Sequence, residues 1–308
     1  MFTRILIPTD FSAPSDAALE FAKTLAGTFG SAVHVLHVAG HETGADPERL
    51  RTAGLLRIHA RVTTEDLRRF RVPPAVELSD KPADEIVSHA RAHAIDLIVM
   101  GTHGRTGIAH LAMGSIAEKV VRTAPCPVCT LREAPPASRK AGGTFRILVP
   151  TDFSAPSDAA LACGRTLASR LGASLHLLHV LEDPFVNGPV GSEVYVAESL
   201  DSRTARLQAA QERVTRLITA DDRSRLRATT EVIVGASART IADFAANSGC
   251  HLIVMGTHGR TGMAHLVTGS VAEHVLRSAP CPVLTVREAR VTQETAYAGR
   301  TAVEQGAP

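Results

Sequence analysis

Short apolar runs alternate with longer amphipathic segments along the first half of the chain. The apolar runs at residues 5–7, 32–38, 75–78, 96–100 and 127–131 have strand length, and residues 14–29, 48–70, 82–93 and 115–123 have helical spacing. The second half repeats this order, with strands near Ile147, Leu175, Thr230, Leu252 and Val283. Near-continuous apolar strands between helices predict an α/β fold of two tandem doubly wound domains, each a parallel five-stranded sheet with helices on both faces.

Local signals place the ends of some helices. Ser12 and Ser15 are both candidate N-caps of the first helix, and Gly30 is positioned to end it. Pro82 lies in the first turn of a later helix, where proline is tolerated.

The sequence is internally duplicated. Residues 4–19 return as 146–161 with a single difference, and residues 97–128 return as 252–283. The first offset is 142 and the second 155, so the second half has gained 13 residues between its second and fourth strands. A repeat this long indicates domain duplication rather than a solenoid. We expect one domain at 1–133, a Pro- and Gly-rich linker at 134–144, a second domain at 145–289 and a poorly ordered tail at 290–308.

Composition limits the class of protein and its partners. The chain has 308 residues, of which 44% are hydrophobic and 21% charged, and its formal net charge is +2. These values are typical of globular domains, and without a basic stripe they do not favour a nucleic-acid partner. No apolar run approaches the ~18 residues of a membrane span. Met1 leads directly into the first strand without a signal-peptide pattern, so we expect a cytoplasmic protein with no membrane contact.

One loop in each half is rich in glycine and carries an arginine. The loops at 101–115 and 256–270 each follow an apolar strand and end where a helix begins. Glycines allow positive φ and close approach to a ligand, while a helix N-terminus supplies N–H donors and partial positive charge. Gly114-Ser115 and Gly269-Ser270 add a hydroxyl at that point. The pattern predicts an anion cradle suited to a polyphosphate.

The glycine spacing distinguishes this loop from two other nucleotide motifs. Neither G-x-x-x-x-G-K-S/T nor G-x-G-x-x-G after the first strand occurs in the chain. Instead, G-x2-G-x9-G-S follows the fourth strand, an aspartate follows the first, and Ala-Pro-Cys-Pro-Val precedes the last. Together these features resemble the ATP-binding class of the universal stress protein family, over almost the whole chain outside the linker and tail.

The resemblance implies a Rossmann-like fold of the adenine nucleotide alpha hydrolase-like type. It implies that each half holds ATP, ADP or AMP, with Mg²⁺ as a candidate companion, over the carboxyl ends of its first and fourth strands. The matching positions in the first half are Pro8, Asp10, Val38, Ala39, Met100, Gly101, His103, Gly104, Arg105, Gly114, Ser115 and Ile116. Those in the second half are Pro150, Asp152, Val180, Leu181, Met255, Gly256, His258, Gly259, Arg260, Gly269, Ser270 and Val271.

Some of these positions have a second interpretation. Asp10 and Asp152 also lie where an aspartate caps the following helix. Arg105 and Arg260 either add charge to the cradle or are ordinary exposed arginines. The inserted stretch near 183–202 is expected close to the second site, where it would affect access.

Cysteines and histidines raise the question of a metal. Cys126 and Cys129 have C-x2-C spacing, but the pair does not recur in the second half, so buried structural thiols are the better interpretation. Histidines on the second strand of each half are expected to be partly buried and hydrogen-bonded. A zinc site there has no recognisable ligand spacing, and no metal ligands are predicted. The histidines concerned are His34, His37, His176 and His179.

Three functions fit the sequence. The first is a regulatory module in which bound ATP stabilises a conformation that partner proteins recognise, in the cytoplasmic stress response that the resemblance implies. The alternative is a slow ATP hydrolase or a phosphoryl or adenylyl transferase, although no catalytic constellation stands out. A non-nucleotide carrier is the third. The resemblance also implies that the two halves pair through their last strands as an internal pseudo-dimer, with a homodimer of whole chains left open.

Overall fold

The computed structural model describes residues 1–41, 44–102, 113–132, 144–182, 200–257 and 269–287. The predicted linker and tail therefore lie almost entirely outside the described residues. The first half comprises β1 (Arg4–Pro8), α1 (Ala13–Phe29), β2 (Ala32–Ala39), α2 (Pro47–His59), α3 (Thr64–Phe70), β3 (Ala75–Leu78), α4 (Pro82–Ala92), β4 (Leu97–Gly101), α5 (Ser115–Thr123) and β5 (Val128–Leu131).

The second half repeats this series. It comprises β6 (Arg146–Pro150), α6 (Ala155–Leu171), β7 (Ser174–Leu181), α8 (Leu200–Leu217), α9 (Ala220–Arg225), β8 (Thr229–Val234), α10 (Ser237–Asn247), β9 (Leu252–Gly256), α11 (Ser270–Ser278) and β10 (Val283–Val286). Among the described residues, no helix is both long and apolar enough to cross a membrane.

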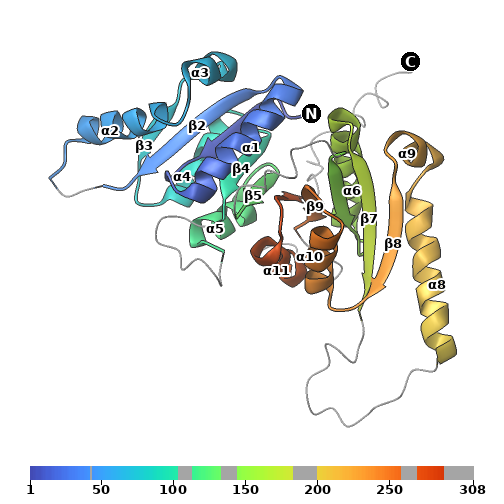
Figure 1. Ribbon diagram of the computed structural model, residues 1–308. Coiled ribbons are helices and arrows are strands. Elements are labelled where there is room, and N and C mark those ends of the chain that lie inside the picture. Colours follow the sequence, from blue (N-terminus) through green and yellow to red (C-terminus); the bar gives the residue numbers. More distant parts are fainter. Residues whose placement is uncertain (42–43, 103–112, 133–143, 183–199, 258–268, 288–308) are drawn as a thin grey trace, which may run out of the picture.

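The strands form one ten-stranded sheet in the order β3-β2-β1-β4-β5-β10-β9-β6-β7-β8 (Figure 1). Pairing is parallel within each half, where Ile5 lies between Val33 and Leu97. The strand order reverses between β1 and β4, and again between β6 and β9, which creates a topological switch point in each half. The predicted fold class is therefore confirmed, and the two sheets are joined.

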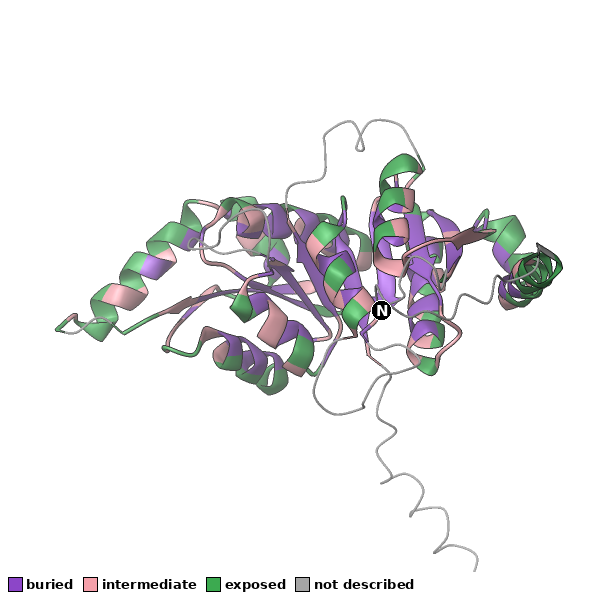
Figure 2. Cartoon of the chain, turned by 90° about the horizontal axis from the view of Figure 1, so that it is seen from below, coloured by how far each residue is buried: buried purple, intermediate pink, exposed green. Residues whose placement is uncertain are grey.

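The sheet is buried on both faces because successive strand residues point to opposite sides. Ile5 and Ile7 belong to a core under α1, α2, α3, α6 and α8, whereas Leu6 belongs to a second core under α4, α5, α10 and α11. Figure 2 shows buried strands between helices whose outward faces are exposed. This double cover explains the nearly unbroken apolar sequence of the strands.

One predicted helix is wrong. Residues 48–70 form two helices, α2 and α3, instead of one. The Thr63 hydroxyl oxygen accepts a hydrogen bond from the backbone N–H of Asp66. The Asp66 carboxylate in turn accepts one from the backbone N–H of Thr63, and this capping box starts a new helix. Thr219 and Asp222 form the same box between α8 and α9.

The first helix has the predicted ends. Ser12 is its N-cap, while the Ser15 hydroxyl donates to the Ser12 carbonyl oxygen. Gly30 ends α1 with a φ of 67°, in the left-handed region that glycine adopts without steric cost. Pro82 is the first residue of α4, as the sequence indicates.

The two halves meet through their last strands. β5 and β10 are antiparallel, with Leu284 opposite Cys129. This is the internal pairing that the resemblance implies. Two arginines reinforce it reciprocally: Arg287 donates to the carbonyl oxygens of Val121 and Ala124 at the end of α5. Arg132 donates to a carbonyl oxygen at the end of α11. Each half therefore supplies an arginine that hydrogen-bonds carbonyl oxygens at the C-terminal end of the other half's last helix.

Candidate functional site

Each half has a cavity at its switch point, where the carboxyl ends of the first and fourth strands meet the N-termini of helices. The first cavity has a volume of about 370 Å³ and the second about 140 Å³. The first is lined by Pro8, Thr9, Asp10, Ser15, Leu36, Val38, Pro82, Ile86, Met100, Gly101, Thr102, Gly114, Ser115, Ile116 and Ala117. The second is lined by Pro150, Thr151, Asp152, Ser157, Leu178, Val180, Ser237, Ile241, Met255, Gly256, Thr257, Gly269, Ser270, Val271 and Ala272.

A tight turn after β1 brings Asp10 to the first cavity. The Asp10 Oδ1 atom accepts from the backbone N–H of Ser12 at 3.1 Å and from its hydroxyl at 2.6 Å. Asp10 thus orients the N-cap serine of α1 but is not itself the cap. Asp152 makes the same pair of bonds to Ser154, at 3.1 Å and 2.5 Å. The carboxylate is therefore both part of the turn and part of the cavity wall.

The turn contains a non-glycine residue in the left-handed region. Phe11 has a φ of 67° and Phe153 a φ of 64°, a conformation that costs of order 1–3 kcal/mol. The Phe11 N–H donates to the Thr9 hydroxyl oxygen at 3.1 Å, and its ring centroid lies 4.3 Å from that of His37. Buried packing holds the strained turn, which fixes the direction of the neighbouring aspartate.

The glycines at the strand ends allow close packing of the backbone. No described glycine of either loop has a positive φ. Gly101 is needed for close packing, because a Cβ there would lie 2.8 Å from the Pro14 Cβ and 2.9 Å from its carbonyl carbon. Gly256 meets Pro156 at the same two distances. The absence of a side chain lets the first turn of α1 or α6 approach the strand end.

The far wall of each cavity is the start of α5 or α11. Gly114 is the N-cap of α5 with a φ of −62°, and its N–H donates to the Thr102 carbonyl oxygen at 2.7 Å. The N-cap residues Gly114 and Gly269 have no side chain, and among the described residues no other side chain caps α5 or α11. The N–H groups of a first helical turn have no partner within the helix, so these ends present donors and partial positive charge. An anionic group is the ligand that such an end accommodates.

The predicted site residues divide into three groups. Those that line the two cavities are Pro8, Asp10, Val38, Met100, Gly101, Gly114, Ser115, Ile116, Pro150, Asp152, Val180, Met255, Gly256, Gly269, Ser270 and Val271. Ala39 and Leu181 end their strands outside the lining. The loop residues His103, Gly104, Arg105, His258, Gly259 and Arg260 lie outside the described residues, as does most of the inserted stretch near 183–202.

Sequence reasoning missed part of each cavity. Thr9, Ser15 and Thr102 line the first one, and their exact recurrence in the duplicated blocks was an available signal. Ile86 and Ile241 come from α4 and α10, whose position over the strand ends requires the three-dimensional fold. They add an apolar surface opposite the polar turn, so each cavity has one apolar and one polar side.

The two cysteines of the C-x2-C pair are buried and line neither cavity. Cys126 and Cys129 are both buried and free. Burial raises the pKa of the Cys126 thiol to about 12 and also raises that of Cys129, so neither is a reactive thiolate. The prediction that this pair is buried is confirmed.

Two of the strand histidines stabilise the turn. The His37 Nδ1 atom lies 2.7 Å from the Thr9 carbonyl oxygen, and the His179 Nδ1 atom lies 2.8 Å from that of Thr151. Both are buried, as expected for hydrogen-bonded core histidines. Each joins the second strand to the turn beside its cavity.

Known proteins match this arrangement. The model of the universal stress protein family matches residues 1–132 and, a second time, 144–287. A universal stress protein of Methanocaldococcus jannaschii is 33% identical over 145 residues, which cover 46% of this chain and 82% of that protein. One from Mycobacterium bovis is 28% identical over 221 residues, 70% of this chain and 66% of the relative.

A solved structure supports the fold over most of this chain. The crystal structure of a universal stress protein from Archaeoglobus fulgidus superimposes with a TM-score of 0.62 at 22% identity, covering 92% of this chain and 98% of that one. Since the family model accounts for both halves, the chain belongs to the universal stress protein family and carries two of its domains in tandem.

Proposed function

We propose that this chain is a regulatory protein of stress response that binds an adenine nucleotide, foremost ATP, in each half. The observation that carries the proposal is the cavity at each switch point, where the Asp10 or Asp152 turn faces a helix N-terminus whose N-cap is a glycine. The helix end suits phosphates, and the polar turn suits the hydroxyls of a sugar. Ligands of doubly wound sheets bind at this place.

The apolar side of each cavity suits a flat base. In the first half it includes Val38, Ile86 and Met100. Ligand sites typically combine such a surface with a few convergent polar groups, in volumes of about 300–1,000 Å³. The first cavity, at about 370 Å³, falls within that range, while the second, at about 140 Å³, is smaller. We therefore propose that the first site has the higher affinity.

The nucleotide content of the purified chain is the first test. Heat-denatured protein is centrifuged, and ATP, ADP and AMP in the supernatant are quantified by chromatography. Close to two equivalents per chain is the expected result. Protein without nucleotide is then titrated calorimetrically with ATP, with and without Mg²⁺. Lack of binding under both conditions contradicts the proposal, and steady conversion of ATP to ADP would favour a hydrolase.

Two variants separate the sites. Ser115→Asp and Ser270→Asp each place a carboxylate in the first turn of an uncapped helix, where negative charge stabilises the helix but repels a phosphate. We expect each variant to keep its melting temperature and lose one equivalent of ATP. Ser115→Asp should remove the tighter binding phase and Ser270→Asp the weaker one. Two unchanged binding phases in both variants would place the nucleotide elsewhere.

A further inference from the structure

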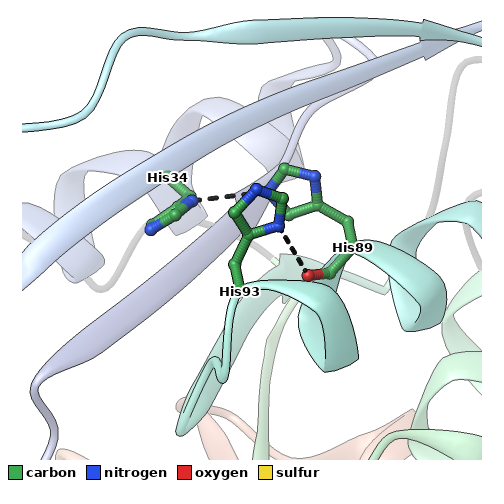
Figure 3. Close-up of side chains that lie close together, drawn as sticks. All are labelled: His34, His89 and His93. Carbon is green, nitrogen blue, oxygen red and sulfur yellow. Dashed lines mark hydrogen bonds between the residues drawn. The ribbon is translucent and has the colours of Figure 1, made fainter.

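Three histidines of the first half lie together on the face of the sheet covered by α4. His34 comes from β2, His89 lies in the last turns of α4, and His93 is the residue that ends that helix (Figure 3). Their nearest ring nitrogens all lie within 4.8 Å of one another. The ring centroids of His89 and His93 are 4.0 Å apart. The cluster is outside both cavities and is independent of the proposed nucleotide sites.

The spacing of two of these nitrogens matches a tetrahedral metal site. Zinc–nitrogen distances of about 2.0–2.1 Å separate two ligand nitrogens by roughly 3.3–3.4 Å. The Nε2 atom of His89 lies 3.4 Å from the Nδ1 atom of His34. His89 and His93 are four residues apart, the spacing that places two histidines on one helical face in zinc proteins. His93 is exposed, so rotation of its side chain can bring the third nitrogen in.

The surroundings fix which nitrogens face the centre. His93 Nδ1 lies 3.0 Å from the His89 carbonyl oxygen. Donation to this carbonyl leaves Nε2 for a metal, the arrangement that orients ligating histidines in known sites.

Of the charges near the cluster, one favours the binding of a cation and one opposes it. The C-terminal end of α4 carries partial negative charge, which favours a cation. Arg4 is the opposing charge, and its guanidinium lies 3.5 Å from the His93 carbonyl oxygen. Arg146 bonds the equivalent carbonyl of Ser248 at 2.7 Å in the second half, so this arginine has a structural role common to both domains.

The second half shows what the strand histidine does without the cluster. At an offset of 155 residues, Phe244 and Ser248 stand where the first half has His89 and His93. His176, the counterpart of His34, has hydroxyls on both ring nitrogens: Ser174 at 3.1 Å and Thr229 at 2.9 Å. The first half has Ala32 in place of Ser174, and there His34 faces imidazoles instead. Within the part of the chain that the structure describes, the three-histidine cluster is therefore confined to the first domain.

We propose that His34, His89 and His93 bind a divalent cation of the zinc class, with solvent in the remaining coordination position. Imidazole nitrogens suit zinc and its neighbours among the transition metals, whereas magnesium and calcium require oxygen ligands. The exposed His93 side supplies both the entry path and the solvent ligand. An open three-histidine set of this kind is a known zinc coordination.

The test uses the full chain, stripped with a chelator and then dialysed against zinc sulfate near neutral pH. Bound zinc is measured by elemental analysis, and cobalt(II) is added separately because its visible absorption reports tetrahedral coordination. The key variant combines His89→Phe with His93→Ser, the pair that the second domain already tolerates at these positions. We expect the parent to hold one more zinc per chain than this variant, and the cobalt band to disappear in it.

Two single substitutions serve as controls for misfolding of the double variant and for adventitious zinc binding. His93→Ala removes an exposed ligand and should weaken zinc binding at least tenfold with an unchanged melting temperature in chelator. His59→Ala removes an exposed histidine of α2 outside the cluster and should leave zinc binding unchanged. Equal zinc affinity in the parent and the double variant overturns the proposal, as does equal weakening by His59→Ala and His93→Ala.

Discussion

Gly101 ends β4 against the first turn of α1, and the missing side chain is what lets the two elements touch. A methyl group there would come within 2.9 Å of the Pro14 backbone, which cannot move without displacing the helix start. The same helix contains Gly27, where an added Cβ meets nothing within 4 Å. One substitution therefore has opposite consequences at two glycines of the same domain.

We predict that Gly101→Ala destabilises the protein and that Gly27→Ala does not. Overpacking at Gly101 should cost about 1–3 kcal/mol, whereas alanine at the exposed helical position of Gly27 should stabilise by up to about 1 kcal/mol. Urea unfolding followed by circular dichroism measures both. Equal stability of Gly101→Ala and the parent would mean that α1 can shift away from the strand end.

At the scale of elements, an acid in the capping box after each break, between α2 and α3 and between α8 and α9, also pairs with the first helix of its half. Asp222 accepts from the N–H of Thr219, the N-cap of α9, and accepts two hydrogen bonds from the Arg165 Nε and Nη2 atoms of α6, at 3.0 Å and 2.9 Å. Burial alone would raise the pKa of Asp222. The hydrogen bonds from Arg165 and Thr219 outweigh it and hold that pKa below its usual 3.8. Lys23 and Asp66 form the corresponding pair in the first half, 2.8 Å apart.

We predict that Asp222→Asn destabilises the chain by about 1–3 kcal/mol near neutral pH, because Arg165 loses its charged partner. A carboxylate with a lowered folded-state pKa stabilises above its unfolded-state pKa and loses this contribution as the pH falls through the folded value. The difference between parent and variant should therefore shrink below about pH 4. Thermal unfolding across pH measures it, and a difference that persists unchanged in acid would contradict the ion pair.

Apolar periodicity and cap residues are local, so the sequence alone predicted the strands and most of the helices. The resemblance carried by the glycine loop and the strand-end aspartate supplied about half of the residues in each cavity lining. The break at Thr63 escaped prediction, since its amphipathic spacing continues across residues 60–63 and only the capping box reveals the new helix. The wall formed by Ile86 depends on how α4 lies over the sheet, which no local pattern encodes. The histidine cluster was missed for the same reason, since β2 contributes His34 from 55 residues before His89.

At the scale of the whole molecule, the antiparallel pairing of β5 and β10 determines how the strands of one half are oriented relative to those of the other. All strands within a half are parallel, so the strands of the two halves run in opposite directions on either side of this joint. The two cavities share no lining residue, and each lies at the carboxyl ends of its own half's strands.

We predict that the double substitution Arg132→Met with Arg287→Met loosens the joint between the halves. Each arginine binds carbonyl oxygens at the end of the other half's last helix, and their loss should cost about 1–3 kcal/mol in total. Differential scanning calorimetry should show the parent's unfolding broaden or split into two transitions. Arg239→Met, at an exposed arginine of α10, is the control. A single sharp transition at the parent's temperature would show that strand pairing alone holds the halves together.

Joining both domains in one polypeptide also changes how the protein can evolve. In a pair of identical subunits, every substitution appears twice, once on each side of the symmetry axis. In this chain each side has its own codons, and the two sides differ: the first half has His89 and His93 where the second has Phe244 and Ser248. Covalent duplication thus allows one half to carry chemistry that the other half lacks.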